Sequence, residues 1–265
     1  LPQISVKARS SVFSYKGKDF DSKNIGTELD VQALLLGNLV QNGDRLTLNL
    51  ELVDTRNGNQ IWGQQYQSSS SDLISFQSEF SNDVLAELTA RLSIPDEGRR
   101  SKEPTQSVEA YRRYLQGLYF WNKRTEEDFR KAINEFRSAV EIDPNYALAY
   151  CGLADSYVLL ENSAGTPSSQ TLPMATAYAQ RAMAIDPLLP EAHASLAITL
   201  HRSWNWLEAE REYKKAIELK PEYPSVHHWY SLYLRETGRF EESLVEAKRA
   251  YDLDPLTGIV VGNLG

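Results

Sequence analysis

Four histidines are the first residues whose type and spacing could do chemistry in this chain. They are His193, His201, His227 and His228. The spacing of His193 and His201 puts both near one face of a helix, where imidazole nitrogens could bind a transition metal. A metal site also needs further ligands and hydrogen bonds that orient them. We therefore interpret these histidines as structural and expect no metal.

The acidic runs Glu126-Glu127-Asp128 and Glu241-Glu242 could hold a general acid and a general base. Both runs stand where helices are expected to begin, and negative charge there is favoured by the helix dipole, so a structural role is favoured. The chain has no G-x-S-x-G elbow, P-loop, H-E-x-x-H helix or Cys-x-x-Cys pair. Its single cysteine, Cys151, excludes an internal disulfide and is interpreted as a small hydrophobe. We expect no enzyme and no cofactor in this chain.

The composition is that of an ordinary globular protein with about two domains. The chain has 265 residues, 42% of them hydrophobic and 24% charged, with a net charge of -8. Neither part is basic, which excludes broad nucleic-acid binding. From the chain as given we also expect neither a membrane-spanning segment nor a secretory leader.

The second part of the chain contains repeated segments, which would position any site there. Pro187, Pro221 and Pro255 recur at intervals of 34 residues, and Pro144 closes a fourth run of the same kind. Thirty-four residues fit two helices and two turns. In residues 190–223 the repeated positions are His193, Leu196, Ala197, Leu200, Ala209, Tyr213, Ala216 and Pro221.

This pattern resembles the tetratricopeptide repeat, and the resemblance covers residues 107–265. The repeats are expected at about 110–146, 147–189, 190–223 and 224–257, with a further helix beginning over 258–265. Small residues at fixed positions predict close helix packing. Extra residues are expected as a longer turn around 122–125 and as a polar loop over 162–173. Because His193 and His227 stand where the pattern has a large packing residue, they are expected to be structural.

The sequence of the first part of the chain predicts a small domain with an antiparallel meander. Residues 44–54 alternate between apolar and polar, which is typical of a half-buried strand. Asn42-Gly43 and Asn57-Gly58 favour type I′ turns that join it to strands over 31–41 and 59–67. A further strand is expected over 3–13 and a short helix over 21–29. A stripe of apolar residues predicts a helix that is capped by Ser70 or Ser71 and covers the sheet. The stripe consists of Leu73, Phe76, Phe80, Val84, Leu88 and Leu92.

Residues 1–95 are similar to the TolB-type amino-terminal-like domain. The resemblance rests on Ser10-Ser11, Tyr15-Lys16-Gly17, Gly26 with Glu28-Leu29, and Ile61-Trp62. The opening strand and first helix of that family would precede Leu1, so we interpret the domain as N-terminally incomplete and expect partner-strand addition or self-association there. Residues 96–106 are expected to be a linker. The fold class is therefore α+β: a partial α/β domain with a meander and a covering helix, followed by an all-α solenoid of at least four helical pairs.

The tetratricopeptide resemblance implies ligand contacts on the inner face of each first helix. The residues at those positions are Tyr111, Tyr114, Trp121, Asp155, Ile198, His201, Arg202, His228, Leu232, Arg235 and Glu236. Aromatic and arginine side chains of this kind dominate binding energy at interfaces. The Lys, Asn and Arg residues with which some relatives hold a terminal carboxylate are absent, because those places hold Tyr114, Leu118, Gly152, Glu191 and Ser195.

Together these features indicate a non-catalytic module that binds a protein or peptide within a larger bacterial signalling protein. The alternatives are a structural module that self-assembles through uncapped solenoid ends and a small-ligand receptor or enzyme in the α/β domain. The compartment stays open. In kinase and cyclase relatives this region often lies beyond a membrane helix, which favours an extracytoplasmic place.

Overall fold

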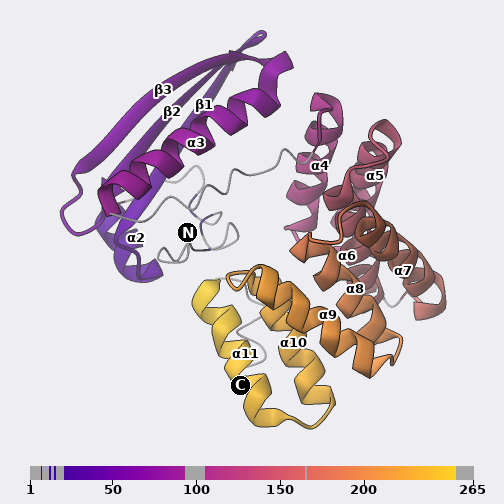
Figure 1. Ribbon diagram of the computed structural model, residues 1–265. Coiled ribbons are helices and arrows are strands. Elements are labelled where there is room, and N and C mark those ends of the chain that lie inside the picture. The colour runs from indigo at the N-terminus through magenta and orange to yellow at the C-terminus, as the bar shows by residue number, and fades with distance from the viewer. Residues whose placement is uncertain are drawn as a thin grey trace. The chain divides into compact units, whose positions relative to one another are not determined.

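The computed structural model describes Lys7, Val12, Tyr15 and residues 21–92, 105–164 and 166–254. The chain forms two compact units, residues 1–103 and 104–265, and Figure 1 shows a sheet unit and a helical unit. The strand expected over 3–13, the linker over 96–106 and the helix expected over 258–265 lie wholly or mainly outside the described residues.

The sheet unit contains the predicted meander. Its strands β1 (Ala33–Asn42), β2 (Arg45–Asp54) and β3 (Gln60–Ser69) pair antiparallel in that order. Helix α2 (Ser22–Leu29) precedes them, and the Asp21 side chain caps it by accepting a hydrogen bond from the Lys23 backbone amide. Leu46, Leu48, Leu50 and Leu52 are all buried, so the predicted alternation of β2 is confirmed.

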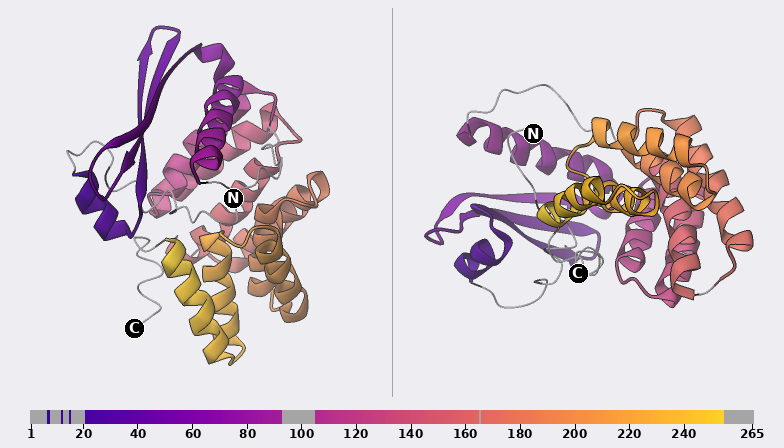
Figure 2. Two further views of the ribbon diagram at one scale, coloured as in Figure 1. Left: turned by 60° about the vertical axis from the view of Figure 1, so that its left-hand side comes forward. Right: turned by 90° about the horizontal axis from the view of Figure 1, so that it is seen from below.

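A long helix covers one face of this sheet. The one-turn helix η1 (Ser70–Asp72) leads into α3 (Leu73–Leu92), which lies along the sheet (Figures 1 and 2). Phe76 is buried among the β2 leucines, and Leu73, Phe80 and Val84 pack beside it, as the apolar stripe predicts. The side chains of Leu88 and Leu92 lie outside the described residues. Ser70 and Ser71 are not caps, because the cap position belongs to Ser69.

Both turn assignments were wrong. Asn42 pairs with Arg45, so the two-residue turn is Gly43-Asp44, and only Gly43 has a positive φ, of 59°. This is the pattern of a type II′ turn, since type I′ needs two such residues. Asn57 and Gly58 lie in a longer connection between β2 and β3, next to a register shift at Leu52 and Val53.

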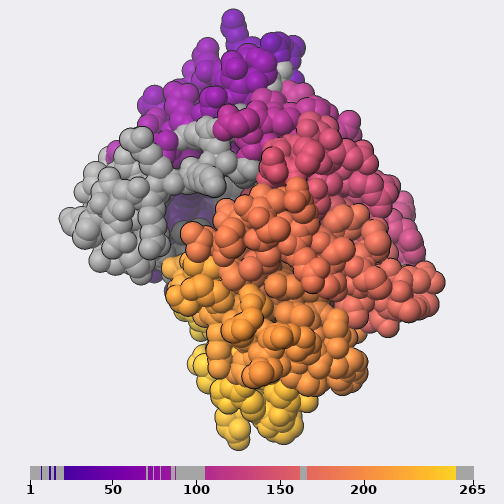
Figure 3. Space-filling model, turned by 45° about the vertical axis from the view of Figure 1, so that its right-hand side comes forward, coloured from indigo at the N-terminus to yellow at the C-terminus, as the bar shows by residue number. Residues whose placement is uncertain are grey.

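The helical unit consists of four antiparallel helix pairs. They are α4 (Val108–Trp121) with α5 (Glu126–Ile142), α6 (Ala147–Ala164) with α7 (Ser168–Ile185), α8 (Pro190–Arg202) with α9 (Trp206–Leu219), and α10 (Pro224–Glu236) with α11 (Phe240–Leu253). The pairs follow one another in chain order, each against the next (Figure 3). The first helices α4, α6, α8 and α10 contact one another in succession more closely than the second helices do. The array therefore curves with its first helices on the inside.

The extra residues of the first two pairs lengthen helices rather than loops, which corrects two predictions. Residues 162–173 were expected as a loop, yet α6 continues to Ala164 and α7 begins at Ser168 with Pro173 inside it. Ser168, Ser169 and Gln170 are exposed in the first turn of α7, where polar side chains need no loop, whereas Thr171 is buried. The three extra residues of the first pair likewise fall in α5, not in the turn before it.

Alanine and glycine allow the helices to approach closely, as predicted. Ala154, Ala197, Ala209, Ala216 and Ala250 are all completely buried. In the first two pairs one ring fills the remaining space: a Cβ atom added at Gly117 would lie 2.5 Å from the ring of Phe136, and one added at Gly152 would lie 2.7 Å from it. The fully buried Phe136 thus requires glycine on α4 and on α6.

The turn between the two helices of a pair contains a left-handed residue. It is Arg124 (φ 60°) in the first pair, Trp204 (φ 62°) in the third and Gly238 (φ 79°) in the fourth. Trp204 and Gly238 are 34 residues apart and so equivalent. This conformation costs a residue other than glycine about 1–2 kcal/mol. The side chain of Trp204 is 75% exposed, and its edge-to-face contact with the Trp206 ring, at 5.4 Å between centroids, recovers only part of that cost.

Exchanging the residue types at this position should move stability in opposite directions. We expect Trp204→Gly to raise the free energy of unfolding by about 0.5–1 kcal/mol, because it relieves the left-handed strain. Gly238→Ala should lower it by about 1 kcal/mol, since its Cβ would meet nothing within 4 Å and only the backbone is affected. Urea unfolding at unchanged m-value measures both. A destabilised Trp204→Gly protein would show instead that the indole holds the turn.

Candidate functional site

The predicted contact residues all lie on the first helices, which line the inside of the curved array. Tyr111, Tyr114 and Trp121 lie on α4, and Asp155 lies on α6. Ile198, His201 and Arg202 lie on α8, whereas α10 holds the last group: His228, Leu232, Arg235 and Glu236. Their surroundings divide them into residues that join the repeats and residues that are available to a partner.

His201, Arg202 and Glu236 join neighbouring repeats. The buried His201 ring lies among the rings of Trp206, Tyr213 and Tyr233, with centroids 5.4–6.1 Å apart. Its Nε2 lies 3.0 Å from Glu236 Oε2. Burial lowers the pKa of His201 although Glu236 opposes the shift. Arg202 donates to Glu161 Oε1 at 3.0 Å. Buried Ile198 is part of the same core.

His193 and His227 have structural roles at equivalent positions. The Nδ1 atom of His193 lies 2.6 Å from Glu212 Oε2, and its Nε2 lies 2.9 Å from the Pro187 carbonyl. His227 repeats both contacts 34 residues later with Glu246 and Pro221, at 2.5 and 2.9 Å. Both nitrogens of each ring are therefore occupied, and no lone pair is left for a metal ion.

A buried carboxyl group lies at the centre of the inner face. Asp155 is 8% exposed and accepts a hydrogen bond of 2.6 Å from the hydroxyl of Ser195, on the next first helix. Burial raises the pKa of Asp155 to about 7, while Ser195 and the charge of Arg124 oppose that rise and Glu191 adds to it. Glu191 itself accepts from Lys220 Nζ at 2.7 Å.

Two tyrosines and one arginine interact electrostatically with this carboxyl group. Burial raises the pKa of the Tyr114 and Tyr223 hydroxyls, and the charges of Glu191 and Asp155 add to both shifts. The sequence did not single out Tyr223 or Arg124 as site residues. Tyr223 precedes α10 and Arg124 lies in a turn, so neither is on a helix. The sequence does contain a signal for Arg124. In an alignment of the repeats it occupies the same position as Gly238, where the backbone conformation favours glycine.

The other residues of α10 are more accessible. His228 and Leu232 are half-buried, and Arg235 is exposed. Burial lowers the pKa of His228 to about 4, and the charges of Arg124 and Arg235 act in the same direction. His228 is therefore neutral near pH 7 and can donate or accept a hydrogen bond.

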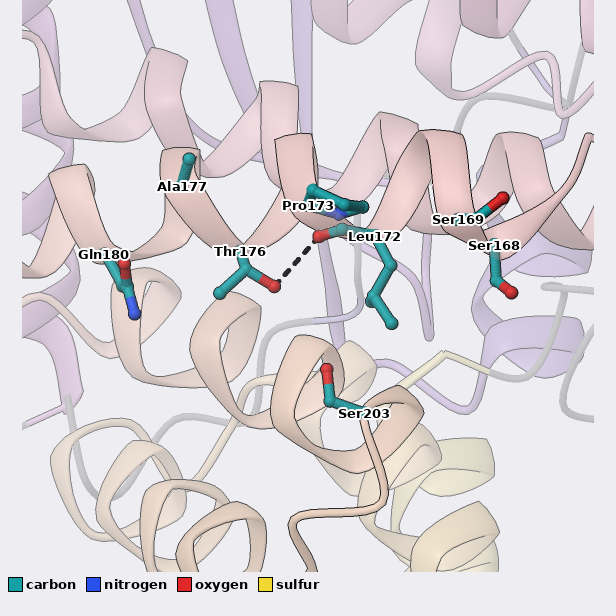
Figure 4. Close-up of a pocket in the computed structure, with 8 residues that line it drawn as sticks. All are labelled: Ser168, Ser169, Leu172, Pro173, Thr176, Ala177, Gln180 and Ser203. Atoms are coloured by element: carbon teal, nitrogen blue, oxygen red, sulfur yellow. Dashed lines mark hydrogen bonds between the residues drawn. The ribbon is translucent and has the colours of Figure 1, made fainter.

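A separate hollow of 480 Å³ opens on the second helix α7 (Figure 4). Thr176 donates a hydrogen bond of 2.9 Å to the Leu172 carbonyl beside it. The lining residues are Ser168, Ser169, Leu172, Pro173, Thr176, Ala177, Gln180 and Ser203. None of these side chains is ionisable near neutral pH, so this hollow offers no group for acid–base catalysis.

Among the described residues no three His, Cys, Asp or Glu side chains gather as metal ligands. The buried thiol of Cys151 has a pKa raised by burial, which disfavours the reactive thiolate. In the described ranges every helix is too short or too polar to cross a membrane.

The Asp155 carboxyl group should make stability depend on pH. Its pKa is raised from 3.8 to about 7, so the folded state holds the proton more tightly than the unfolded state. The resulting stabilisation is complete below pH 3.8 and is lost as the pH rises through about 7. We expect Asp155→Asn to be more stable than the wild type at pH 8, with a difference that shrinks toward pH 4.

Urea unfolding of both proteins between pH 4 and pH 8 measures this difference. The opposite contribution of His228 is present in both proteins and cancels in the comparison. Parallel stability curves would show that Asp155 does not titrate in this range.

Comparison with known proteins agrees with the helical architecture. Residues 125–160 match the family model described as TPR repeat. The chain is 30% identical over 208 residues to putative adenylate cyclase 3 of Rhizobium meliloti, covering 76% of this chain and 34% of that protein. It is 24% identical over 151 residues to transcriptional regulator HilA of Salmonella typhimurium, covering 56% of this chain and 27% of that protein. The chain thus spans about a third or less of these relatives.

A solved structure of a thermophilic TPR protein from Thermus thermophilus is similar over 74% of this chain and 95% of its own, with 18% identity and a TM-score of 0.47. The match of residues 125–160 falls on α5 and α6, within the stacked helix pairs. Residues 125–160, which form most of α5 and α6, are therefore similar to a tetratricopeptide repeat.

Proposed function

We propose that the repeat unit is a non-catalytic module that holds a protein or peptide partner along its first helices. The observation that carries this proposal is the inner face itself. There Tyr114 on α4 and His228 and Leu232 on α10 are half-buried, and Asp155 on α6 is a buried carboxyl group. Half-buried aromatic and aliphatic side chains lose their remaining contact with water when a partner covers them, which is where interfaces gain most of their energy.

We further propose that the whole protein is a bacterial signalling or regulatory protein. The names of the two relatives, an adenylate cyclase and a transcriptional regulator, support this role. The sheet unit would then be a TolB-type amino-terminal-like domain, for which the three-stranded meander and its covering helix are the support. Partner binding to the repeats would be passed to an output domain elsewhere in the protein.

Selection from a displayed library of random peptides tests the binding function. We expect the wild-type protein to enrich a defined set of peptides, and the double variant His228→Ala/Leu232→Ala to bind them about tenfold more weakly. The residues implied by the repeat pattern include Arg202, but its substitution would leave Glu161 unpaired, so it is not used as a test. The double variant leaves the contacts of His227 with Glu246 and of Glu236 with His201 intact.

The matched control is Ser169→Ala/Gln180→Ala in the hollow on α7. Equal binding by the control and the wild type is expected. Loss of binding in this control, with the α10 variant unaffected, would assign the site to α7 and contradict the proposal.

A second candidate function is self-assembly through the end of the repeat array. Phe240, Leu244 and Val245 on α11 are 60–66% exposed. In the preceding pair the residue equivalent to Phe240 is Trp206, which packs against Tyr233 of the following helix with ring centroids 5.7 Å apart. Phe240 and Leu244 therefore occupy positions that, one repeat earlier, contact the following helix, since Glu210, the equivalent of Leu244, accepts a hydrogen bond from the Tyr230 hydroxyl.

Sedimentation equilibrium over a wide concentration range tests self-assembly. We expect the mass to rise with concentration and the variant Leu244→Glu to remain a monomer, because a buried unpaired carboxylate is costly. Glu241→Gln on the same helix is the control. A constant monomer mass in the wild-type protein would remove this candidate while leaving peptide binding untouched.

A further inference from the structure

Three tyrosine rings form a row where helix α6 meets the second helices. Tyr150 and Tyr157 lie on α6, which packs against both α5 and α7, and Tyr178 lies on α7. The rings of Tyr157 and Tyr178 are stacked, with centroids 5.9 Å apart and an angle of 21° between their planes. The centroid of the Tyr150 ring lies 6.2 Å from that of Tyr178. All three residues are half-buried, so each keeps part of its surface in contact with solvent.

An arginine lies at each end of this row of rings. The guanidinium of Arg137 on α5 donates a hydrogen bond of 3.1 Å to the Tyr157 hydroxyl. The guanidinium of Arg181 on α7 lies 5.9 Å from the centroid of the Tyr150 ring and donates to the Pro144 carbonyl at 3.3 Å. Both arginines are exposed. The contacts therefore run without a break from one arginine through the three tyrosines to the other.

Neither of these two arginines is matched by a carboxylate. Among the described residues their hydrogen-bond acceptors are a hydroxyl and a carbonyl, and neither arginine forms an ion pair. By contrast, Arg113 pairs with Glu135 at 3.2 Å. Glu141 lies one turn after Arg137 on α5, and within the described ranges it forms no ion pair. In a chain with a net charge of -8, two such cations leave a local positive charge for a partner to neutralise.

The same positions carry an internal pair of polar groups in the third repeat. Tyr150 corresponds to His193 and Tyr178 corresponds to Glu212, because the small and apolar residues around them have the same spacing. His193 Nδ1 lies 2.6 Å from Glu212 Oε2, so these side chains satisfy each other. In the second repeat aromatic rings and unmatched cations take their place. The polar groups of the second repeat are therefore available to a partner.

The residue types of this surface indicate what it binds. Tyrosine and arginine dominate the binding energy of protein interfaces, and side chains that are already held by stacking lose little entropy on binding. A guanidinium matches a carboxylate through two parallel hydrogen bonds. A single-stranded nucleic acid needs free aromatic faces and a basic groove, whereas these rings stack on each other and the surface has two arginines. An acidic protein segment suits both the charges and the rings.

We propose that an acidic segment of a partner protein docks on this surface, which we call the tyrosine surface. It consists of Arg137, Tyr150, Tyr157, Tyr178 and Arg181. Carboxylates of the partner would pair with the two arginines, and its apolar groups would cover the rings between them. This inference goes beyond the proposed function, because the tyrosine surface lies against the second helices and leaves the inner face free for another partner.

A titration followed by two-dimensional ¹H–¹⁵N NMR tests the tyrosine surface directly. The probes are the capped peptides acetyl-Glu-Tyr-Glu-Tyr-Glu-amide and acetyl-Gln-Tyr-Gln-Tyr-Gln-amide, which differ in charge but hardly in shape. At slightly acidic pH, where glutamate is still ionised, we expect the acidic peptide to shift the Nε–H signals of Arg137 and Arg181 to saturation with one Kd. The neutral peptide should leave both signals unchanged.

The double variant Arg137→Gln/Arg181→Gln should raise the Kd for the acidic peptide at least tenfold, because hydrogen bonds between charged groups are lost. Each single variant should raise it less. Both side chains are exposed, so we expect the variants to fold, and an unchanged urea midpoint checks this. Arg130→Gln is the matched control on α5. Arg130 makes an exposed ion pair with Glu126, and its variant should bind as the wild type does.

Four outcomes would overturn the proposal. They are the absence of a saturable shift with the acidic peptide, equal shifts with both peptides, an unchanged Kd in the double variant, and a lower Kd for a single-stranded oligothymidylate. The last would assign the surface to nucleic acid.

The inner-face variant His228→Ala/Leu232→Ala separates this site from the proposed function. It should bind the acidic peptide with the Kd of the wild type. If it loses that binding while the tyrosine-surface variant keeps it, the peptide occupies the inner face. That result would overturn the docking site proposed here and support the proposed function. Failure of the library selection, with the acidic peptide still bound at Arg137 and Arg181, would have the opposite meaning.

Discussion

Close approach of helices at alanine and glycine positions is the constraint on which the helical unit depends. A single helix pair cannot bury its apolar stripe alone, so it must stack on the next pair. Hydrophobic attraction has no direction, and the places where side chains are smallest therefore decide where two helices meet. Ala209, Ala216 and Ala250 occupy such places, and Phe136 fills the gap between Gly117 and Gly152. The curvature of the array and the line of first helices inside it follow from these contacts.

Polar contacts between helices add directionality to this packing. The His193 contacts with Glu212 and the Pro187 carbonyl recur at His227 with Glu246 and Pro221. Each histidine ties a first helix both to its second helix and to the turn before it. Buried polar groups need satisfied hydrogen bonds, so the two contacts of each ring fix one arrangement where apolar packing alone would allow several. The same positions looked like metal ligands only as long as their partners were unknown.

The sequence predicted the repeating elements well because their causes are local. The 34-residue interval placed the third and fourth helix pairs, and the alternation in 44–54 placed β2 and its buried leucines. Predictions that depended on dihedral angles or distant partners were less successful. Polar residues over 162–173 suggested a loop, although an exposed helix face accepts them equally. The pairing of Asn42 with Arg45, which moved the turn to Gly43-Asp44, depends on the register of the whole hairpin.

In the candidate site, too, the sequence predicts local positions but not the partners that the fold brings to them. The repeat pattern identifies inner-face positions, but it does not show which charges the fold has already paired. Arg202 and Glu236 were expected to contact a ligand, yet their charges are engaged by Glu161 and His201. A partner would have to break those contacts, and leaving one member of a buried pair unmatched is costly. Among the described residues Arg124 has no such contact to break, and it holds its side chain on Trp121 at the expense of backbone strain. Availability, and not position in the repeat, is therefore what distinguishes the groups on the inner face that a partner can use.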